Sequence, residues 1–361
     1  MKDMPEFPWE VILPHRKRAA EHPDGIVNLA MGEPVDPTPG PVREALARAA
    51  DAPGYPPTEG TPELRAAVAG WLRRRHGVRV DPTAVLPAVG TKELIAWLPT
   101  MLGTGPGDLV AFPRLAFPTF DVSARLAGAD SRPVDSPLDL AGAAERPKVV
   151  WLNSPSNPDG RILTVAELRE LVAWARERGT VLADDECYIE YGWDRRPPSL
   201  LDPRVCGDSH DGLLAVYSLS KRSNLAGYRA GFCVGDPHLV RRLLSVRKHA
   251  GHAVPGPVQA AMTAALDDDT HVDEQRARYA RRRDVLSGAL RSAGFTIEHS
   301  EGGLFLWATR DEPCWTTVKD LAERGILVAP GTFYGTAGER HVRIAFTATD
   351  ERIAAAAGRL S

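Results

Sequence analysis

Between residues 84 and 235, short apolar runs alternate with longer amphipathic segments. The runs are AVLPAV (84–89), DLVAF (108–112), KVVWLN (148–153), TVLADD (180–185), LLAVYS (213–218) and AGFCV (230–234). Helical spacing appears between them, as in TKELIAWLPTML (91–102) and TVAELRELVAWARERG (164–179). Apolar runs this short, separated by helix-length segments, predict an α/β fold whose mostly parallel sheet is covered by helices on both faces.

The last third of the chain has a different pattern. A long arginine-rich helical pattern covers residues 270–293, and the runs FTIEHS, GLFLWAT, GILVAP and HVRIAF follow it, with the helical CWTTVKDLAERG between the middle two. This α+β pattern predicts a smaller second domain. The proline-rich N-terminal stretch has no strong period. We expect an N-terminal segment (1–45) that joins the small domain, a large cofactor-binding domain (46–265) and a small C-terminal domain (266–361).

Composition and charge exclude several classes of protein. The chain has 361 residues, of which 43% are hydrophobic and 25% charged, as in globular domains. A net charge of −3 and an isoelectric point near 6.4 provide no overall field for nucleic acid or an anionic membrane. Residues 1–20 lack the apolar run of a signal peptide, so a cytoplasmic location is expected. The four cysteines lie far apart, so we expect no metal and no disulfide.

Lys221 lies in SLSKRSNLAGYRAGF (218–232), directly after the apolar run LLAVYS. Open α/β sheets bind ligands at the carboxyl ends of their strands. Desolvation there lowers the pKa of a lysine, and a neutral amine can attack a carbonyl to form a Schiff base. Ser218, Ser220 and Arg229 supply hydroxyl groups and a guanidinium suited to phosphate. Taken alone, the segment is equally compatible with a surface loop and a solvated lysine.

Two other strand ends carry polar side chains. Asp185 and Tyr188 follow TVLAD, and Asn157 follows KVVWLN. A carboxylate at the end of a buried strand needs a partner, and a protonated ring nitrogen would be one. Asn157 and the Tyr188 hydroxyl are suited to hydrogen-bonding a phenolic oxygen. A helix cap for Asp185 and an Asn-Pro turn for Asn157 explain the same residues without a ligand.

A fourth strand end, VGTKEL (89–94), is suited to an anion. Gly90 allows the backbone to approach closely, and the helix that opens at Thr91 and Lys92 has free N–H groups. Phe117 follows a further strand end and provides a ring that can stack on a planar cofactor. An ordinary turn and a core phenylalanine would look the same.

These strand ends together describe one ligand. A phosphorylated, pyridine-like aldehyde held as a Schiff base on Lys221, with Asp185 at its ring nitrogen, is pyridoxal 5′-phosphate. A protonated ring nitrogen makes the ring an electron sink for the carbanion that forms when an amino acid loses its α-proton.

The chain resembles the class I/II aminotransferases of the fold-type I pyridoxal-phosphate family, from GEP (32–34) to HVRIAF (341–346). The ordered motifs NPDG, DECY, SLSK and GYRAG carry the resemblance. The runs VLPAVGTKELIAWLPTMLG, SLSKRSNLAGYRAGF and ATRDEPCW are most similar to actinobacterial succinyldiaminopimelate aminotransferases. The resemblance implies a large domain with a mostly parallel seven-stranded sheet covered by helices, and a smaller α+β domain.

The resemblance also implies roles for single residues. Lys221 is the Schiff-base lysine and moves the proton, Asp185 pairs with the ring nitrogen, and Asn157 and Tyr188 bond the ring oxygen. Phe117 stacks on the ring, where many relatives have Tyr or Trp. The phosphate would be held at the turn of Gly90 by the backbone amides of Thr91 and Lys92, by Ser218, Ser220 and Arg229, and by Tyr55 of the neighbouring subunit.

The resemblance also implies residues that bind the substrate. Gly32 matches the family glycine whose loop lies near the substrate, and Asn157 is expected to contact the substrate as well as the ring oxygen. Arg343 matches the arginine that clamps the substrate α-carboxylate, a bidentate contact that lysine makes poorly. A surface ion pair is the alternative for Arg343. A site that Tyr55 shares between subunits implies a homodimer.

The resemblance therefore implies a pyridoxal-phosphate aminotransferase that moves an amino group from glutamate to N-succinyl-2-amino-6-oxopimelate in lysine biosynthesis. Its partners are then small amino and keto acids, without nucleic acid or membrane. An aminotransferase of another specificity, or a β-lyase on the same scaffold, also needs Lys221 and Asp185. A ligand sensor would carry an extra N-terminal DNA-binding domain. Because the aminotransferase-like region begins near residue 25, we expect no room for one.

Overall fold

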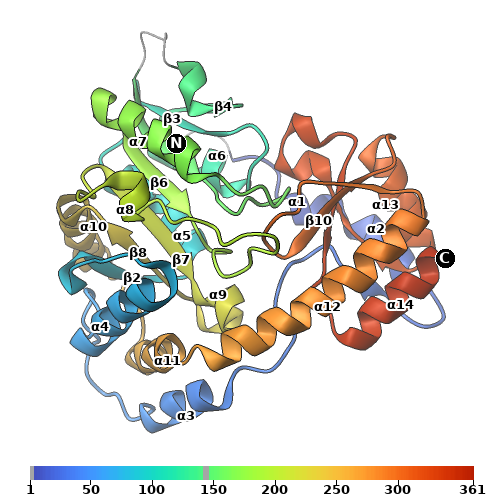
Figure 1. Cartoon of the computed structure of the whole chain (residues 1–361), viewed down its shortest axis with the longest axis horizontal. Helices are drawn as coiled ribbons and strands as arrows, with labels where there is room; N and C mark the ends of the chain where they lie inside the picture. The colour runs from blue at the N-terminus through green and yellow to red at the C-terminus, as the bar shows by residue number, and fades with distance from the viewer. Residues whose placement is uncertain (1–3, 141–145) are drawn as a thin grey trace.

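The computed structural model describes residues 4–140 and 146–361, and its elements form a large and a small lobe (Figure 1). The large lobe is built on a seven-stranded sheet with the order β2-β8-β7-β6-β5-β3-β4. Only β8 runs antiparallel to its neighbours within this sheet. The strands are β2 (Val85–Val89), β3 (Leu109–Pro113), β4 (Asp130–Val134), β5 (Pro147–Leu152), β6 (Val181–Asp185), β7 (Leu213–Ser218) and β8 (Ala230–Gly235).

Six of these strands coincide with the apolar runs of the sequence to within two residues, and the predicted α/β fold is confirmed. The strand missing from the prediction is β4, whose residues DSRPV include a single buried side chain, Val134. The other four side chains of β4 are exposed or half-buried, so no apolar run marks this strand.

Helices cover both faces of the sheet because neighbouring strand residues point to opposite sides. Val150 and Leu152 of β5 belong to a core shared with α4, α7 and α11, whereas Val149 and Trp151 pack with α5, α6 and α10. Thr164 and Glu167 form a capping box at the start of α7. The helices are α3 (Gly40–Arg48), α4 (Pro62–Trp71), α5 (Thr91–Met101), α6 (Thr119–Ala127), α7 (Val165–Arg178), α8 (Pro203–Cys206), α9 (Leu219–Arg222), α10 (Pro237–Ala250) and α11 (Gly256–Asp267).

The small lobe is built on an antiparallel sheet with the order β12-β13-β10-β9. Its helix α12 runs from α11 across the molecule and joins the two lobes (Figure 1). The elements are α12 (Thr270–Ser292), β9 (Thr296–Glu298), β10 (Phe305–Thr309), α13 (Cys314–Glu323), β11 (Ile326–Leu327), β12 (Ala329–Pro330), β13 (Val342–Ala345) and α14 (Asp350–Leu360). The run GILVAP, read as one strand, is two, because β11 pairs with β1 and β12 with β13.

The N-terminal stretch contains helices that the sequence pattern did not predict. They are α1 (Pro8–Val11) and α2 (Leu13–Ala20), and they precede β1 (Val27–Asn28). Ala19 is the one buried residue of α2, so no apolar stripe marks the helix. β1 pairs in parallel with β11 of the small lobe, whereas α3 packs against α11 of the large lobe. Among the described residues, no helix has the length and apolar character to cross a membrane.

Candidate active site

Lys221 lies on α9, a single helical turn directly after β7. Ser218 caps this turn, since its Oγ accepts a hydrogen bond from the Ser220 N–H at 3.1 Å. The Lys221 Nζ donates to the Gly32 carbonyl oxygen at 2.5 Å, which brings the N-terminal segment to the end of the sheet. Burial lowers the pKa of Lys221 to about 8, and the positive charges of Arg343 and Arg229 act in the same direction. A useful fraction of this amine is therefore neutral near physiological pH.

Asp185 is the last residue of β6 and is buried. Among the described residues, its carboxylate accepts a hydrogen bond from the Cys187 backbone N–H at 3.2 Å and forms no ion pair. Burial raises the pKa of Asp185 to about 6. Asn153 fixes the strand end, because its Nδ2 donates to the Asp185 carbonyl oxygen at 2.7 Å. A buried carboxylate without a cation fits a protonated ring nitrogen, which would supply the missing positive charge.

Arg343 on β13 reaches from the small lobe to the large one. Its Nη1 donates to the Asn157 Oδ1 at 2.7 Å, and its Nη2 donates to the Ala30 carbonyl oxygen at 2.6 Å. The guanidinium also lies 3.9 Å from the centre of the Phe305 ring. Because the Asn157 oxygen is engaged, its Nδ2 is the end of the amide that remains to donate to a ligand oxygen. The surface-ion-pair alternative is wrong for Arg343, which is only 4% exposed.

Tyr188 is buried beside these groups, with its ring 5.5 Å from that of Phe305 in an edge-on arrangement. Burial raises the pKa of Tyr188 well above its ordinary value. The hydroxyl group therefore keeps its proton and acts as a hydrogen-bond donor. Gly32 packs against the same Phe305 ring so closely that a Cβ there would lie 2.2 Å from Cε1. Only glycine fits at this position without moving the ring.

Positive groups converge where β2 ends and β8 begins. Gly90 adopts a φ of 77° at the start of α5, and a Cβ there would lie 2.3 Å from the Arg229 Nη2. Partial removal from water and the nearby Arg229 both lower the pKa of Lys92. β7 pairs Ser218 with Gly231, so the SLSK turn lies beside the same spot. Two cations, a helix N-terminus and hydroxyl groups form a donor set suited to a phosphate.

Phe117 and Tyr55 have different positions relative to this donor set. The Lys92 Nζ lies 5.9 Å from the centre of the Phe117 ring, so this ring is near the positive groups. Tyr55 is fully exposed and contributes nothing to the site of its own chain. The structure thus brings the predicted site residues together at one edge of the sheet, apart from Tyr55.

Comparison with known proteins gives this arrangement its family. A family model described as "Aminotransferase class I and II" matches residues 24–360. The chain belongs to the class I and II aminotransferases. It is similar to the "4-dedimethylamino-4-oxo-anhydrotetracycline transaminase" of Streptomyces rimosus, with 77% identity over 361 residues that cover 100% of both chains. A "probable aminotransferase" of Mycobacterium tuberculosis is 58% identical over 359 residues, which cover 99% of this chain and 85% of the relative.

Among solved structures, the N-succinyldiaminopimelate aminotransferase of Mycobacterium tuberculosis has the same fold. Its TM-score is 0.88 at 26% identity, and the match covers 97% of this chain and 96% of the other. The predicted fold-type I aminotransferase is therefore confirmed. The aminotransferase acts on small molecules and, like its family, uses pyridoxal 5′-phosphate. When bound, this cofactor supplies an aldehyde carbon that bonds to amines and a ring that accepts electron density.

The aminotransferase also contains site residues that the sequence patterns did not single out. Asn153 ends the run KVVWLN and could have been found from its place at a strand end. Its Oδ1 accepts from the Asn157 N–H at 2.8 Å, so it orders the SPSNPDG loop as well as Asp185. Ala30 acts through its backbone, which leaves no signal in the sequence. Tyr191 donates its hydroxyl hydrogen to the Lys221 carbonyl oxygen at 2.8 Å, a contact between residues 30 positions apart.

Proposed function

We propose that this aminotransferase transfers an amino group from glutamate to the 4-oxo carbon of an anhydrotetracycline-type fused-ring ketone. The observation that carries the proposal is the 77% identity to the Streptomyces rimosus transaminase, which extends over the whole of both chains. The names of the two similar relatives favour transamination over β-elimination on the same scaffold.

Lys221 is the proposed catalytic residue. Its amine would hold the cofactor between turnovers and, once released, would take and return the proton at the α-carbon of the amino donor. The lowered pKa of Lys221, about 8, supports this role, because a base near the working pH both accepts and returns a proton. Asp185 would keep the ring nitrogen protonated, and Asn157 and Tyr188 would donate to the ring oxygen.

The phosphate group of the cofactor is assigned to the positive groups at the end of β2. The backbone N–H groups of Thr91 and Lys92, the hydroxyls of Ser218 and Ser220 and the Arg229 guanidinium would hold it, at the turn of Gly90. Phe117 would stack on the ring.

Arg343 is the proposed clamp for the donor α-carboxylate. Its two hydrogen-bond acceptors, Asn157 and Ala30, come from different lobes and fix the plane of the guanidinium. Gly32 lies beside the proposed catalytic amine, since the Lys221 Nζ donates to the Gly32 carbonyl oxygen. A ring ketone has ring carbons on both sides of its carbonyl, so its reacting carbon carries no carboxylate for Arg343 to bind. We therefore infer that Arg343 reads the amino donor and not the fused-ring acceptor.

N-Succinyl-2-amino-6-oxopimelate, the acceptor predicted from the sequence resemblance, is the second candidate. It is favoured by the fold shared with the N-succinyldiaminopimelate aminotransferase of Mycobacterium tuberculosis. That protein is 26% identical to this chain, against 77% for the tetracycline-pathway transaminase, so the ring ketone is the better-supported acceptor.

A homodimer with shared sites is also proposed. Tyr55 is fully exposed on the loop between α3 and α4, where its hydroxyl is free to reach the phosphate of a second copy. We keep the domain limits 1–45, 46–265 and 266–361. The pairing of β1 with β11 supports assigning the start of the chain to the small domain.

Label transfer tests the proposed reaction. The cofactor-loaded enzyme is incubated with nitrogen-15-labelled L-glutamate and either 4-dedimethylamino-4-oxo-anhydrotetracycline or N-succinyl-2-amino-6-oxopimelate, and the products are separated and weighed by mass spectrometry. We expect the label in the amine of the fused-ring product. Label only in the succinylated amino acid would replace the proposed acceptor by the second candidate, and label in neither would refute both.

A further inference from the structure

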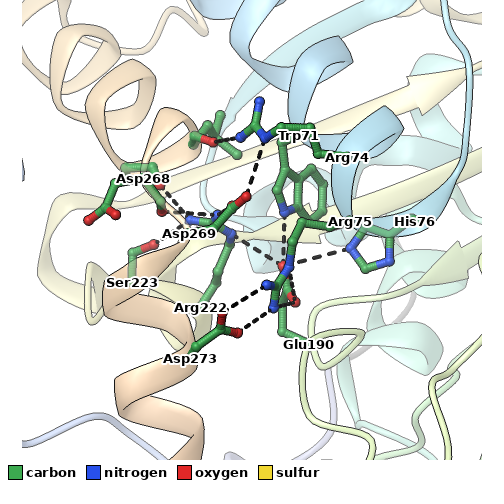
Figure 2. A network of polar contacts seen from close by, with 12 residues as sticks. Trp71, Arg74, Arg75, His76, Glu190, Arg222, Ser223, Asp268, Asp269 and Asp273 are labelled. Atoms are coloured by element: carbon green, nitrogen blue, oxygen red, sulfur yellow. Dashed lines mark hydrogen bonds and ion pairs between the residues drawn. The ribbon is translucent and has the colours of Figure 1, made fainter.

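A network of ion pairs and hydrogen bonds surrounds Glu190 and Arg222, the residue that follows Lys221 in the chain (Figure 2). It joins the helical turn after α4, the loop after β6, the turn 219–223 and the junction of α11 with α12. We call residues 219–223 the lysine turn. The labelled members of the network are Trp71, Arg74, Arg75, His76, Glu190, Arg222, Ser223, Asp268, Asp269 and Asp273.

Glu190 is the central acceptor of this network, and its side chain is only 6% exposed. Its carboxylate accepts hydrogen bonds from the Trp71 Nε1 at 2.8 Å and from the Arg75 Nη2 at 2.9 Å. The Arg222 Nε lies 3.5 Å from the same carboxylate. Its neighbours, first His76 and then Arg222 and Arg75, hold the pKa of Glu190 well below its ordinary value despite its burial. Glu190 is therefore a fixed negative charge at any working pH.

Arg222 directly follows Lys221 in the chain, and its side chain is 3% exposed. Its Nη1 donates to the Ala265 carbonyl oxygen at 2.6 Å, and its Nη2 donates to the Asp269 Oδ1 at 3.1 Å. Ala265 lies on α11, and Asp269 lies between α11 and α12, the helix that continues into the small lobe. Arg222 thus ties the lysine turn to the junction of the two lobes.

The residues on either side of Arg222 are held as well. The Tyr191 hydroxyl donates to the Lys221 carbonyl oxygen at 2.8 Å. The Ser223 Oγ accepts from the Arg222 Nη1 at 3.0 Å and lies 2.9 Å from the His271 Nε2. A helix of four residues has almost no internal hydrogen bonds of its own. The direction of the Lys221 side chain therefore depends on contacts made from outside the turn.

We propose that Arg222 is a positioning residue for Lys221, and that it holds the lysine turn between the Glu190 carboxylate and the Asp269 junction of the lobes. The proposal rests on the proposed function, in which Lys221 binds the cofactor and moves the proton. The Arg222 side chain is only 3% exposed, and its guanidinium is bonded to Ser223, Ala265 and Asp269, so we expect it to act through Lys221 and not by contact with a ligand. A displaced amine slows proton transfer steeply, since misplacement by about 1 Å can cost about a hundredfold in rate. Substrate affinity, set by Arg343 and its neighbours, would change little.

Arg222→Lys tests this inference, because it keeps the positive charge but loses the forked guanidinium that bonds several acceptors at once. Arg74→Lys is the matched control. Arg74 bonds the same Asp269 carboxylate at 3.2 Å and the Leu266 carbonyl oxygen at 2.7 Å, but not the lysine turn. For each variant, kcat, the KM for glutamate and the pH midpoint of the visible band of the cofactor-loaded enzyme are measured. The rate at which the apoenzyme takes up pyridoxal 5′-phosphate and the Tm are measured alongside.

For Arg222→Lys we expect kcat to fall about tenfold or more with the KM for glutamate within about twofold of wild type. The pH midpoint should shift, and cofactor uptake should slow. Arg74→Lys should resemble wild type in kcat, in the KM for glutamate, in the pH midpoint and in the rate of cofactor uptake. If Arg222→Lys lowers only the Tm and leaves kcat and the midpoint unchanged, the residue is merely structural and the inference is overturned.

A second variant keeps the test decisive if Arg222→Lys does not fold. Glu190→Gln retains an oxygen for Trp71 but removes the charge that faces Arg222, so the same changes should appear in smaller degree. An unchanged kcat and midpoint in folded Glu190→Gln would overturn the inference. Lys221→Ala, prepared in parallel, separates the two levels of the argument. If it keeps the visible band and turnover, the proposed function and this inference both fail; if it loses them while Arg222→Lys behaves as wild type, only the inference fails.

Discussion

Arg343→Lys should separate the two halves of the reaction. In the structure, the Arg343 guanidinium donates one hydrogen bond to Asn157 and one to Ala30, and its remaining N–H groups are available to a carboxylate. A lysine ammonium has three hydrogens on one atom and cannot serve Asn157, Ala30 and both carboxylate oxygens at once. The substitution therefore removes at least one charge-assisted hydrogen bond from the donor complex.

The expected size of the effect follows from that one bond. A hydrogen bond to a charged group contributes about 1.5–3 kcal/mol, and about 1.4 kcal/mol corresponds to a tenfold change in rate or affinity. The rate constant for the glutamate half-reaction, divided by the dissociation constant for glutamate, should fall roughly 10- to 150-fold. The half-reaction with the fused-ring ketone should fall by less than about fivefold, because no carboxylate sits on its reacting carbon.

Rapid quenching provides the assay. Each half-reaction is followed in a single turnover, and the aldehyde and amine forms of the cofactor are quantified by chromatography, since a conjugated ketone absorbs in the same region as the cofactor. Any misfolded fraction, and any weakened support for Asn157, affects both half-reactions and cancels in their ratio. Equal losses in both half-reactions would show that the acceptor depends on Arg343 as much as glutamate does, and Arg343 would then not be specific for the amino donor.

Lys221→Ala should lose the visible band of the cofactor-loaded enzyme and all transamination. Normal turnover would show that Lys221 is not the catalytic lysine. The rate at which the apoenzyme takes up pyridoxal 5′-phosphate should rise about tenfold per pH unit below pH 8 and level off above it, because the Lys221 pKa is about 8 and the neutral amine is the nucleophile. An uptake rate still rising at about pH 10 would indicate an ordinary lysine. Gly32→Ala, whose Cβ would lie 2.2 Å from Phe305, should lower the free energy of unfolding by about 1–3 kcal/mol and slow both half-reactions; an unchanged Tm would show that the ring yields. Tyr55→Phe should weaken cofactor binding without changing the solution mass, and unchanged binding would remove Tyr55 from the partner's phosphate site.

The sequence predicts those parts of the fold that depend on local patterns. The core strands β2, β3, β5, β6, β7 and β8 have continuous apolar runs because they are buried on both faces. The parallel arrangement then places Asp185, the loop of Asn157 and Lys221 at one edge, so their convergence follows from the sheet topology. The edge strand β4 and the helix α2 escape detection because most of their side chains face water.

Contacts between distant segments leave no pattern in the sequence. The Arg343–Asn157 bond joins residues 186 positions apart, and the Lys221–Gly32 bond joins residues 189 positions apart. Glu190 looks like any charged loop residue until the fold surrounds it with Trp71, Arg75 and Arg222. The amino acceptor cannot be predicted from sequence motifs for a related reason. A fused-ring ketone and a keto acid can share the same cofactor residues and differ only in how the pocket wall is shaped, which no short motif encodes.

The two half-reactions of the wild-type enzyme, taken in sequence, decide which amino acceptor the enzyme uses. L-Glutamate is added to the cofactor-loaded enzyme, the excess is removed, and 4-dedimethylamino-4-oxo-anhydrotetracycline or N-succinyl-2-amino-6-oxopimelate is supplied for one turnover. We predict that glutamate converts the cofactor to its amine form and that the fused-ring ketone restores the aldehyde form in full while the succinylated keto acid does not. A cofactor that glutamate leaves unchanged, or one restored only by the succinylated keto acid, would contradict the account.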